Sequence, residues 1–202
     1  MKKSDETKKK IIESTVYLVA RDGYTGTSTK QIATHAGVSE AIIFKYYGNK
    51  NQLLMTIVQQ TIDEFYDYSF NHILPDLLDN NDKKNFSDLV YNIMFERFSY
   101  FNKNSKKLQV IFQEMLVNEQ IREYFKKKVW SRLDALSREI LERGQKEGVL
   151  REIDPYFMQK AFFGMLLYTN VFERIFGVDT NAYSPETQAK ISMDVLFNGI
   201  KN

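Results

Sequence analysis

Apolar residues recur every three or four positions along most of the chain, which is the period of helices that bury one face. The first 72 residues contain four such patterns, each separated from the next by Gly, Ser, Thr or Asn. They cover about residues 4–22, 29–36, 40–47 and 50–72. Pro75 lies just beyond the fourth pattern, so we expect that helix to close there.

The starts of these helices have recognisable caps. Ser28 and Gln31 have the spacing of a capping box, and Ser39 is a candidate N-cap for the third pattern. Gly37 supplies the left-handed residue that a sharp turn between two helices needs.

Five further helical patterns follow a polar loop at residues 79–85. They cover about residues 86–101, 108–116, 121–140, 154–177 and 184–200. Pro155 and Pro185 each follow a capping residue, as proline does at the first position of a helix. With only 9 Gly and 3 Pro in the chain, a turn-rich β protein is excluded. We therefore predict an all-α chain of about nine helices.

The second and third patterns form a candidate helix-turn-helix, since two short helices are joined by a turn at Gly37. Ala33 lies where such helices cross closely, and Ile32, Val38 and Ile43 provide their apolar seam. The first pattern adds a third helix, because two short helices bury too little surface alone. We expect a DNA-binding domain at residues 1–48 and a helical ligand-binding and dimerisation domain at residues 49–202.

The second helix of a helix-turn-helix points its N-terminal residues at base edges in the major groove. Ala41 and Ile42 are suited to thymine methyl groups, whereas Lys45 and Tyr46 are suited to phosphates. Glu40 has two open interpretations, a favourable charge at the helix N-terminus or an acceptor for a cytosine amino group.

Three residues outside that helix are phosphate candidates. Lys50 opposes the dipole at the start of the fourth helix, which makes sense if a phosphate docks there. Thr29 and Lys30, at the start of the second helix, are similar candidates. The charge distribution is consistent with phosphate contacts, because residues 1–50 contain nine Lys or Arg and five Asp or Glu. That segment has a net charge of +4 in a chain of +2, which leaves −2 for the remainder and favours a polyanionic partner for the first part.

These residues together resemble the N-terminal domain of the tetracycline-repressor (TetR) family over about residues 11–54. The resemblance rests on this series: Gly23-Tyr24, Thr27-Ser28-Thr29, Ile32-Ala33, Ala36-Gly37-Val38-Ser39, Ile43-Phe44, Tyr46-Tyr47, Asn49-Lys50 and Leu53-Leu54. It implies a cytoplasmic homodimer that binds a palindromic operator and releases it when an inducer binds. It also implies DNA-contacting positions at Thr29, Ser39, Glu40, Ala41, Ile42, Lys45, Tyr46 and Lys50. Glu40 and the Lys45-Tyr46 pair depart from the residues usual in the family, so the base preference does not follow from the resemblance.

Aromatic and Met side chains in the C-terminal domain predict an apolar pocket for a hydrophobic molecule, such as a fatty-acyl derivative, a drug or an aromatic metabolite. Taken singly, each of them fits an ordinary core position better than a ligand contact, and only the set as a whole favours a pocket. The candidates are Phe65, Tyr91, Phe95, Phe98, Phe112, Met115, Trp130, Phe162, Met165, Tyr168 and Phe172.

The pattern from residue 154 to 176 is apolar on nearly every side, which requires burial all round. We expect it to pair with the last helix and with the same two helices of a second copy, in a four-helix bundle. The predicted interface residues are Phe163, Leu167, Ile191, Val195 and Ile200.

Other functions find little support in the sequence. There is no Cys, and His35 and His72 have no neighbouring ligands for a metal site. No nucleophile elbow, P-loop or dinucleotide fingerprint is present, so neither catalysis nor a cofactor is expected. The polar start resembles no signal peptide, and charged residues interrupt the most apolar stretch, so no membrane partner is expected. A regulator that acts through protein contacts and, less well supported, a helical enzyme stay open as alternatives.

Overall fold

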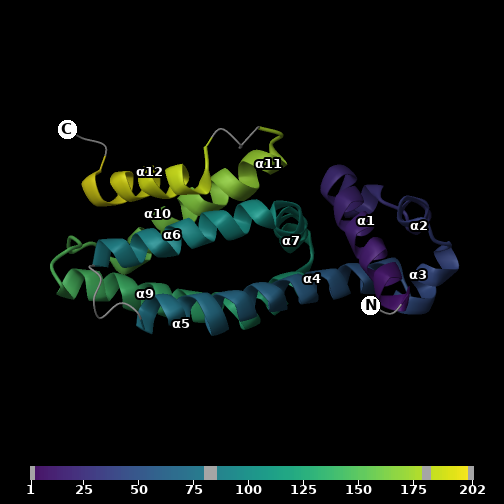
Figure 1. Cartoon of the computed structure of the whole chain (residues 1–202), viewed down its shortest axis with the longest axis horizontal. Coiled ribbons are helices and arrows are strands. Elements are labelled where there is room, and N and C mark those ends of the chain that lie inside the picture. The colour runs from purple at the N-terminus through teal and green to yellow at the C-terminus, as the bar shows by residue number, and fades with distance from the viewer. Residues whose placement is uncertain (1–2, 80–85, 179–182, 200–202) are drawn as a thin grey trace. The chain divides into compact units, whose positions relative to one another are not determined.

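The computed structural model describes residues 3–79, 86–178 and 183–199, and all regular structure in these ranges is helical. The helical backbone of the described ranges forms nine continuous stretches, which confirms the predicted all-α fold (Figure 1). The expected polar loop falls mainly on residues 80–85, and Ile200 follows the last described residue, so both lie outside the described residues. Among the described helices, none has an uncharged apolar run of membrane-spanning length.

Three of the nine stretches contain π-helical turns, so they are divided into several labelled elements. The elements are α1 (Lys3–Gly26), α2 (Thr29–Ala36), α3 (Glu40–Tyr47), α4 (Lys50–Tyr66), η1 (Asp67–Ile73), α5 (Leu74–Asp79), α6 (Phe86–Lys103), α7 (Ser105–Val117), α8 (Glu119–Phe125), η3 (Lys126–Trp130), α9 (Ser131–Lys146), α10 (Pro155–Leu167), η4 (Tyr168–Phe172), α11 (Glu173–Ile175) and α12 (Pro185–Asn198).

The capping signals act locally as the sequence predicts, with one exception. The Ser28 hydroxyl oxygen accepts a hydrogen bond from the backbone N–H of Gln31 at 3.2 Å. The side-chain oxygen of Gln31 accepts one from the backbone N–H of Ser28 at 2.7 Å. Gly37 has φ 67° and ψ 35°, the left-handed conformation that ends α2. Ser39 is the N-cap residue of α3, but its side chain makes no capping hydrogen bond. The prediction of Ser39 as the N-cap residue is therefore confirmed, without a side-chain hydrogen bond.

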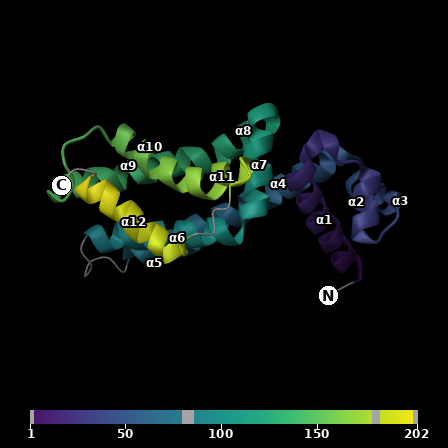
Figure 2. The same cartoon turned by 90° about the horizontal axis from the view of Figure 1, so that it is seen from above.

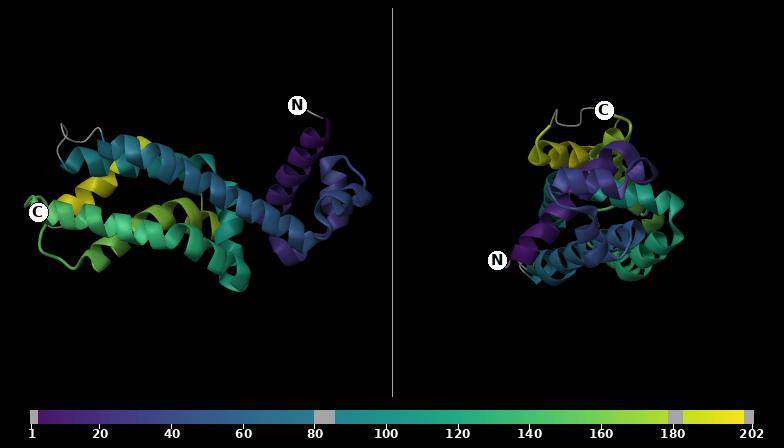
Figure 3. Two further views of the ribbon diagram at one scale, coloured as in Figure 1. Left: turned by 90° about the horizontal axis from the view of Figure 1, so that it is seen from below. Right: turned by 90° about the vertical axis from the view of Figure 1, so that its right-hand side faces the viewer.

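The fourth predicted helix does not close at Pro75. Helical backbone continues from Lys50 to Asp79, drawn in blue in the left view of Figure 3. Pro75 is the second residue of α5, which begins directly after the π-helical segment η1. A proline inside a helix removes one backbone hydrogen bond, and a π-helical turn is an irregularity that accompanies such interruptions.

The helices pack into two units. Unit 1 contains residues 1–64 and 106–125, and unit 2 contains residues 65–105 and 126–202. The helices α7 and α8 thus belong with α1–α4, where Gln109 Nε2 donates to the Ala20 carbonyl at 3.1 Å and Tyr124 donates to Asp63 at 2.9 Å. The boundary expected after residue 48 concerned the helix-turn-helix alone and stays a prediction.

Unit 1 is held by an apolar cluster that α1, α2, α3 and α4 share. Ile11, Ile32 and Ile43 are fully buried in it, and Leu53 of α4 joins them. Ala33 is 4% exposed, which agrees with the small residue that a close crossing of α2 with its neighbours needs. Figure 2 shows α1 beside α2 and α2 beside α3, the helices that this cluster brings together.

In unit 2, α12 packs on α6 and α10 packs on α9 (Figures 1 and 2). Phe86, Leu89, Met94 and Phe98 of α6 are at most 2% exposed, so α6 is the central helix of this unit. Gly144 of α9 lies directly against Phe86, since a Cβ built there would be 2.4 Å from Phe86 Cζ and 2.7 Å from Leu150 Cδ1.

We expect Gly144→Ala to lower the free energy of unfolding by about 1–3 kcal/mol, because a rigid buried ring must move to accommodate one methyl group. Urea unfolding followed by circular dichroism measures this. Gly26→Ala is the control, since a Cβ there meets only Asp22 Cβ at 3.6 Å and should change stability by less than about 0.5 kcal/mol. Equal effects of the two substitutions would contradict the close packing of α9 on Phe86.

Candidate nucleic-acid interface and cavities

One face of α3 is free of its own unit. Ile43 is fully buried in the cluster of unit 1, whereas Ala41, Phe44 and Lys45 are exposed. Because these three residues lie one turn apart or side by side on a helix, they form a continuous outward strip. Figure 3 shows α3 within unit 1 in two further views. A helix held on one side by a buried isoleucine and open on the other is able to lie in a groove.

Two of the residues expected at DNA are partly turned inward. Ile42 and Tyr46 are half-buried and pack against the core cluster of unit 1. The Lys8 ammonium lies 5.4 Å from the centroid of the Tyr46 ring. Ile42 and Tyr46 therefore flank the outward strip and are not at its centre.

Glu40 has a partner that the sequence did not reveal. The Thr29 hydroxyl donates to the Glu40 carboxylate and so joins the N-terminal ends of α2 and α3. Thr29 and Glu40 are both half-buried, whereas Lys30 and Ser39 are exposed. The two ends that should approach a phosphate backbone are therefore tied together, which fixes their relative position.

Lys50 also has partners within unit 1. Its ammonium donates to the Tyr24 carbonyl at 2.5 Å and lies 4.0 Å from the centroid of the Tyr24 ring. Burial lowers the pKa of Lys50, and the nearby Glu114 of α7 opposes that shift. Burial likewise raises the pKa of the Glu114 carboxyl, against the effect of Lys50. This network accounts for a cation at the start of α4 without a phosphate.

Phe44 was missed by the sequence reasoning. It is 46% exposed on α3, next to Lys45 and one turn after Ala41. An exposed aromatic side chain on the outer face of a short helix is a candidate contact with sugar or base. The only sequence signal was that Phe44 directly follows the buried Ile43, and neighbouring positions on a helix face different directions.

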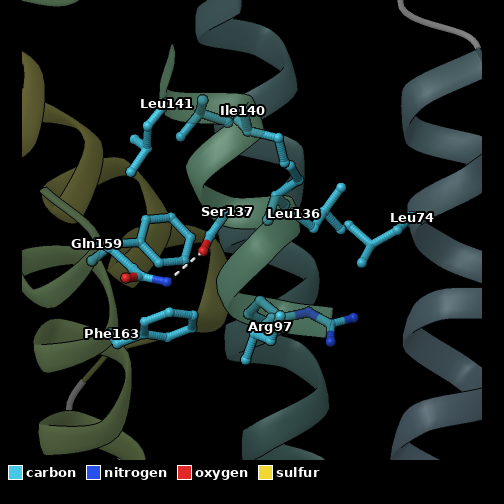
Figure 4. Close-up of a pocket in the computed structure, with 12 residues that line it drawn as sticks. Leu74, Arg97, Leu136, Ser137, Ile140, Leu141, Gln159 and Phe163 are labelled. Carbon is cyan, nitrogen blue, oxygen red and sulfur yellow. Dashed lines mark hydrogen bonds between the residues drawn. The ribbon is translucent and has the colours of Figure 1, made fainter. Parts of the chain in front are cut away.

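Unit 2 contains a small cavity of about 80 Å³ between α5, α6, α9 and α10. Most of its lining is apolar, and the polar exceptions are Arg97, Ser137 and Gln159. Gln159 Nε2 donates to Ser137 Oγ at 2.6 Å, as the dashed line in Figure 4 marks, and to Asp134 at 3.0 Å. In the same view the Arg97 side chain extends away from Gln159, toward the helix that carries Leu74.

A second cavity of about 320 Å³ adjoins the first and shares Val90, Leu141 and Phe162 with it. It extends to the segment after α9 and to α12, and Met158 and Met165 are part of its wall. Met side chains allow such a wall to adapt to different occupants.

The predicted pocket residues are divided between several environments. Phe162 lines both cavities, Met165 lines the second, and Tyr168 lines an open groove beside α12. Phe65 and Phe98 are buried, Tyr91 stacks on Phe95 at 6.4 Å, and Trp130 lies 5.8 Å from Phe163. Phe112 and Met115 belong to unit 1, and Phe172 is 38% exposed. The aliphatic and polar lining of the first cavity, including Arg97, was not foreseen, because a buried arginine has no signature in the local sequence.

The residues predicted at the dimer interface also lie in different environments. Ile191 is 49% exposed and lines the open groove with Val195, Gly164 and Tyr168. Phe163 instead lines the first cavity, and Leu167 is half-buried. The helix pair α10 and α12 thus presents an apolar strip outward, although not with all of the expected residues.

The sequence matches a model of the family described as "Bacterial regulatory proteins, tetR family" over residues 11–57, which include all of α2, α3 and the start of α4. Over these residues the chain has the N-terminal domain of the TetR family. Within the described residues no three His, Asp or Glu side chains gather as metal ligands do.

The curated relatives that this chain resembles are described as helix-turn-helix regulators. The chain is 27% identical to the probable transcriptional regulator YttP of Bacillus subtilis over 146 residues, or 70% of this chain and 66% of YttP. It is 30% identical over 90 residues to the negative transcriptional regulator IcaR of Staphylococcus aureus, or 44% of each. The chain thus spans less than two thirds of the length of these curated relatives.

Two solved structures have the same fold over most of the chain. FadR of Bacillus subtilis, in complex with stearoyl-CoA, has a TM-score of 0.66 at 19% identity. The match covers 96% of this chain and 99% of the FadR chain. AibR, in complex with isovaleryl coenzyme A and operator DNA, has a TM-score of 0.73 at 20% identity. The match covers 95% of this chain and 98% of the AibR chain. At these identities the likeness shows the fold alone.

The contacts of Lys50 predict its effect on stability. We expect Lys50→Met to lower the free energy of unfolding by about 1 kcal/mol, because the Tyr24 carbonyl loses its donor and the ring loses its cation. Urea unfolding is the measurement, and Lys45→Met is the matched control, since it removes the same charge from an exposed position. If both variants unfold at the same urea concentration, the Tyr24 contact contributes nothing.

Proposed function

We propose that this protein is a DNA-binding transcription regulator, most simply a repressor, that releases its operator when a hydrophobic small molecule binds in unit 2. The observation that carries the DNA-binding part is the outward strip of α3, with Ile43 buried behind it and Ala41, Phe44 and Lys45 exposed. The solved structure of AibR with operator DNA and the negative regulator IcaR support this proposal. We expect it to act in the cytoplasm and not as an enzyme.

The expected contacts divide into two groups. Ala41 and Phe44 would meet bases and sugars, whereas Lys30, Ser39 and Lys45 are exposed and placed for phosphates. Thr29 and Glu40 hold the two helix ends in register, and Ile42 and Tyr46 flank the strip. Lys50, which is held by Tyr24, would contribute mainly by positioning the start of α4.

The effector part rests on the two cavities of unit 2. Leu74 lines the first cavity and belongs to the same continuous helix as α4, whose Leu53 and Ile57 are in the core of unit 1. An occupant that displaces Leu74 would thus act on a helix that both units share. Linkage then requires DNA to weaken effector binding by the same factor.

A second copy is the expected partner of the apolar strip on α10 and α12. Tyr168 and Ile191 are 57% and 49% exposed, and Gly164 has no atom within 4 Å of a built Cβ, so another helix has room to approach. A two-fold dimer would present two α3 helices to a palindromic operator, with half-sites one helical turn or a multiple apart.

DNA binding is tested by fluorescence anisotropy with a pool of random duplexes and then with a duplex selected from it. We expect affinity to fall at least about a hundredfold between 50 and 200 mM salt, because several phosphates are neutralised. Lys45→Ala should weaken binding to all sequences alike and reduce the salt slope by about one. Lys127→Ala in unit 2 is the control, and an equal loss with both variants, or no binding at any salt, would refute the proposal.

The dimer is tested by light scattering on a sizing column. We expect the native chain to have twice the mass of one copy at micromolar concentration, and Ile191→Glu to have the mass of one copy, because a buried unpaired charge opposes association. Leu116→Glu, at a 74% exposed position of unit 1, should leave the mass unchanged. A native chain with the mass of one copy would contradict the arrangement.

A further inference from the structure

We propose that the effector is an amphiphilic carboxylate whose acidic group binds Arg97 inside unit 2 and whose hydrocarbon part occupies the two adjoining cavities. This inference rests on the proposed function, since it names the class of molecule that the cavities receive. Its evidence is a buried guanidinium with one unpartnered nitrogen at the wall of a mostly apolar space.

Arg97 is 7% exposed, although a guanidinium stays protonated in proteins. Its Nη1 donates to Ser69 Oγ at 2.6 Å, whereas its Nη2 is buried without a hydrogen-bond partner. No carboxylate of the described residues lies within ion-pair distance of it, although Glu96 attracts the guanidinium and so opposes the lowering of the Arg97 pKa by burial. The neighbouring Glu96 accepts from the Tyr68 hydroxyl at 2.6 Å instead.

Aromatic rings surround the guanidinium without neutralising it. Its carbon lies 5.6 Å from the centroid of Phe65 and 5.9 Å from those of Tyr68 and Tyr100. Ring faces attract a cation and hold it in one position, but they accept no conventional hydrogen bond from Nη2. A carboxylate fits the planar fork of a guanidinium and supplies both the missing acceptor and the missing charge.

The size of the cavities indicates how such a molecule would lie. The first cavity, of about 80 Å³, is smaller than the roughly 150 Å³ that holds a benzene ring. It has room for a small acidic group and the first carbons next to Arg97. The rest of a chain or ring would pass Phe162, which lines both spaces, into the second cavity of about 320 Å³.

The second cavity provides the route of entry. Phe157, Val149 and Ile153 line it and are 62%, 43% and 37% exposed, so this side opens to solvent. Arg151 also lines this space and is exposed. A thioester with a large polar head would leave that head outside near Arg151 and would place no charge at Arg97. Binding that depends on Arg97 therefore indicates a free acid, whereas binding that depends on Arg151 indicates a thioester.

The experiment measures dissociation constants by isothermal titration calorimetry for decanoate, decanol and decanoyl-CoA on the full chain without DNA. We expect decanoate to bind about tenfold or more tightly than decanol, the effect of one charge-assisted hydrogen bond in a buried site. Arg97→Met should reduce that ratio to within about threefold, whereas the matched variant Arg151→Met should keep it. Arg97→Met should fold, because removing an unpaired buried charge does not destabilise a core. Arg97→Lys provides a second test, since it keeps the charge and should keep part of the preference.

Each other outcome overturns the inference. Equal binding of decanoate and decanol, or no binding of decanoate, would show that no carboxylate is recognised. Tightest binding of decanoyl-CoA with dependence on Arg151 would place the charged head at the mouth instead. DNA release by each compound is measured separately. If decanoate binds through Arg97 but never releases DNA, the proposed function fails while the assignment of Arg97 stands.

Discussion

The burial of Ile43 against Ile11 and Ile32 is the interaction on which the nucleic-acid interface depends. It rotates α3 so that Ala41, Phe44 and Lys45 face outward, and the small Ala33 lets α2 pack closely enough to hold that rotation. The bond from Thr29 to Glu40 then fixes the two helix ends relative to each other. An interface made by so short a helix is only as precise as the core behind it, which is why rigid support accompanies its few exposed residues.

Unit 2 combines features that a purely structural core would avoid. Its first cavity is walled mainly by aliphatic side chains, yet a buried arginine with one unpartnered guanidinium nitrogen belongs to the wall. Its helix α10 exposes aromatic residues, such as Phe157 at 62%, where a self-contained unit would have polar ones. Burying an unpaired charge and exposing apolar surface both oppose stability. Both become understandable if other molecules, an anionic effector and a second copy, complete this unit.

The three π-helical segments lie inside long helices, and none ends its helix. The segment η1 precedes Pro75 and allows the helix that begins at Lys50 to continue to Asp79, so the chain passes from unit 1 to unit 2 without a loop. Such turns insert one extra residue per turn and are found at functional sites more often than chance allows. Ser69, on η1, accepts a hydrogen bond from Arg97 Nη1, so this irregular turn also supports the cavity wall.

The sequence by itself determined the helices, most of their caps and the helix-turn-helix, because spacing of apolar residues, the Ser28–Gln31 box and the turn at Gly37 act within a few residues of each other. It also indicated which short helix would meet DNA. Only the tertiary structure decided that Ile42 and Tyr46 pack against the core of unit 1. It also decided that Lys50 donates to the Tyr24 carbonyl and that Phe44 is exposed. It alone brought Arg97 beside Ser69 and Leu74. Those relations join residues from different helices, and their contacts depend on packing that no local pattern encodes.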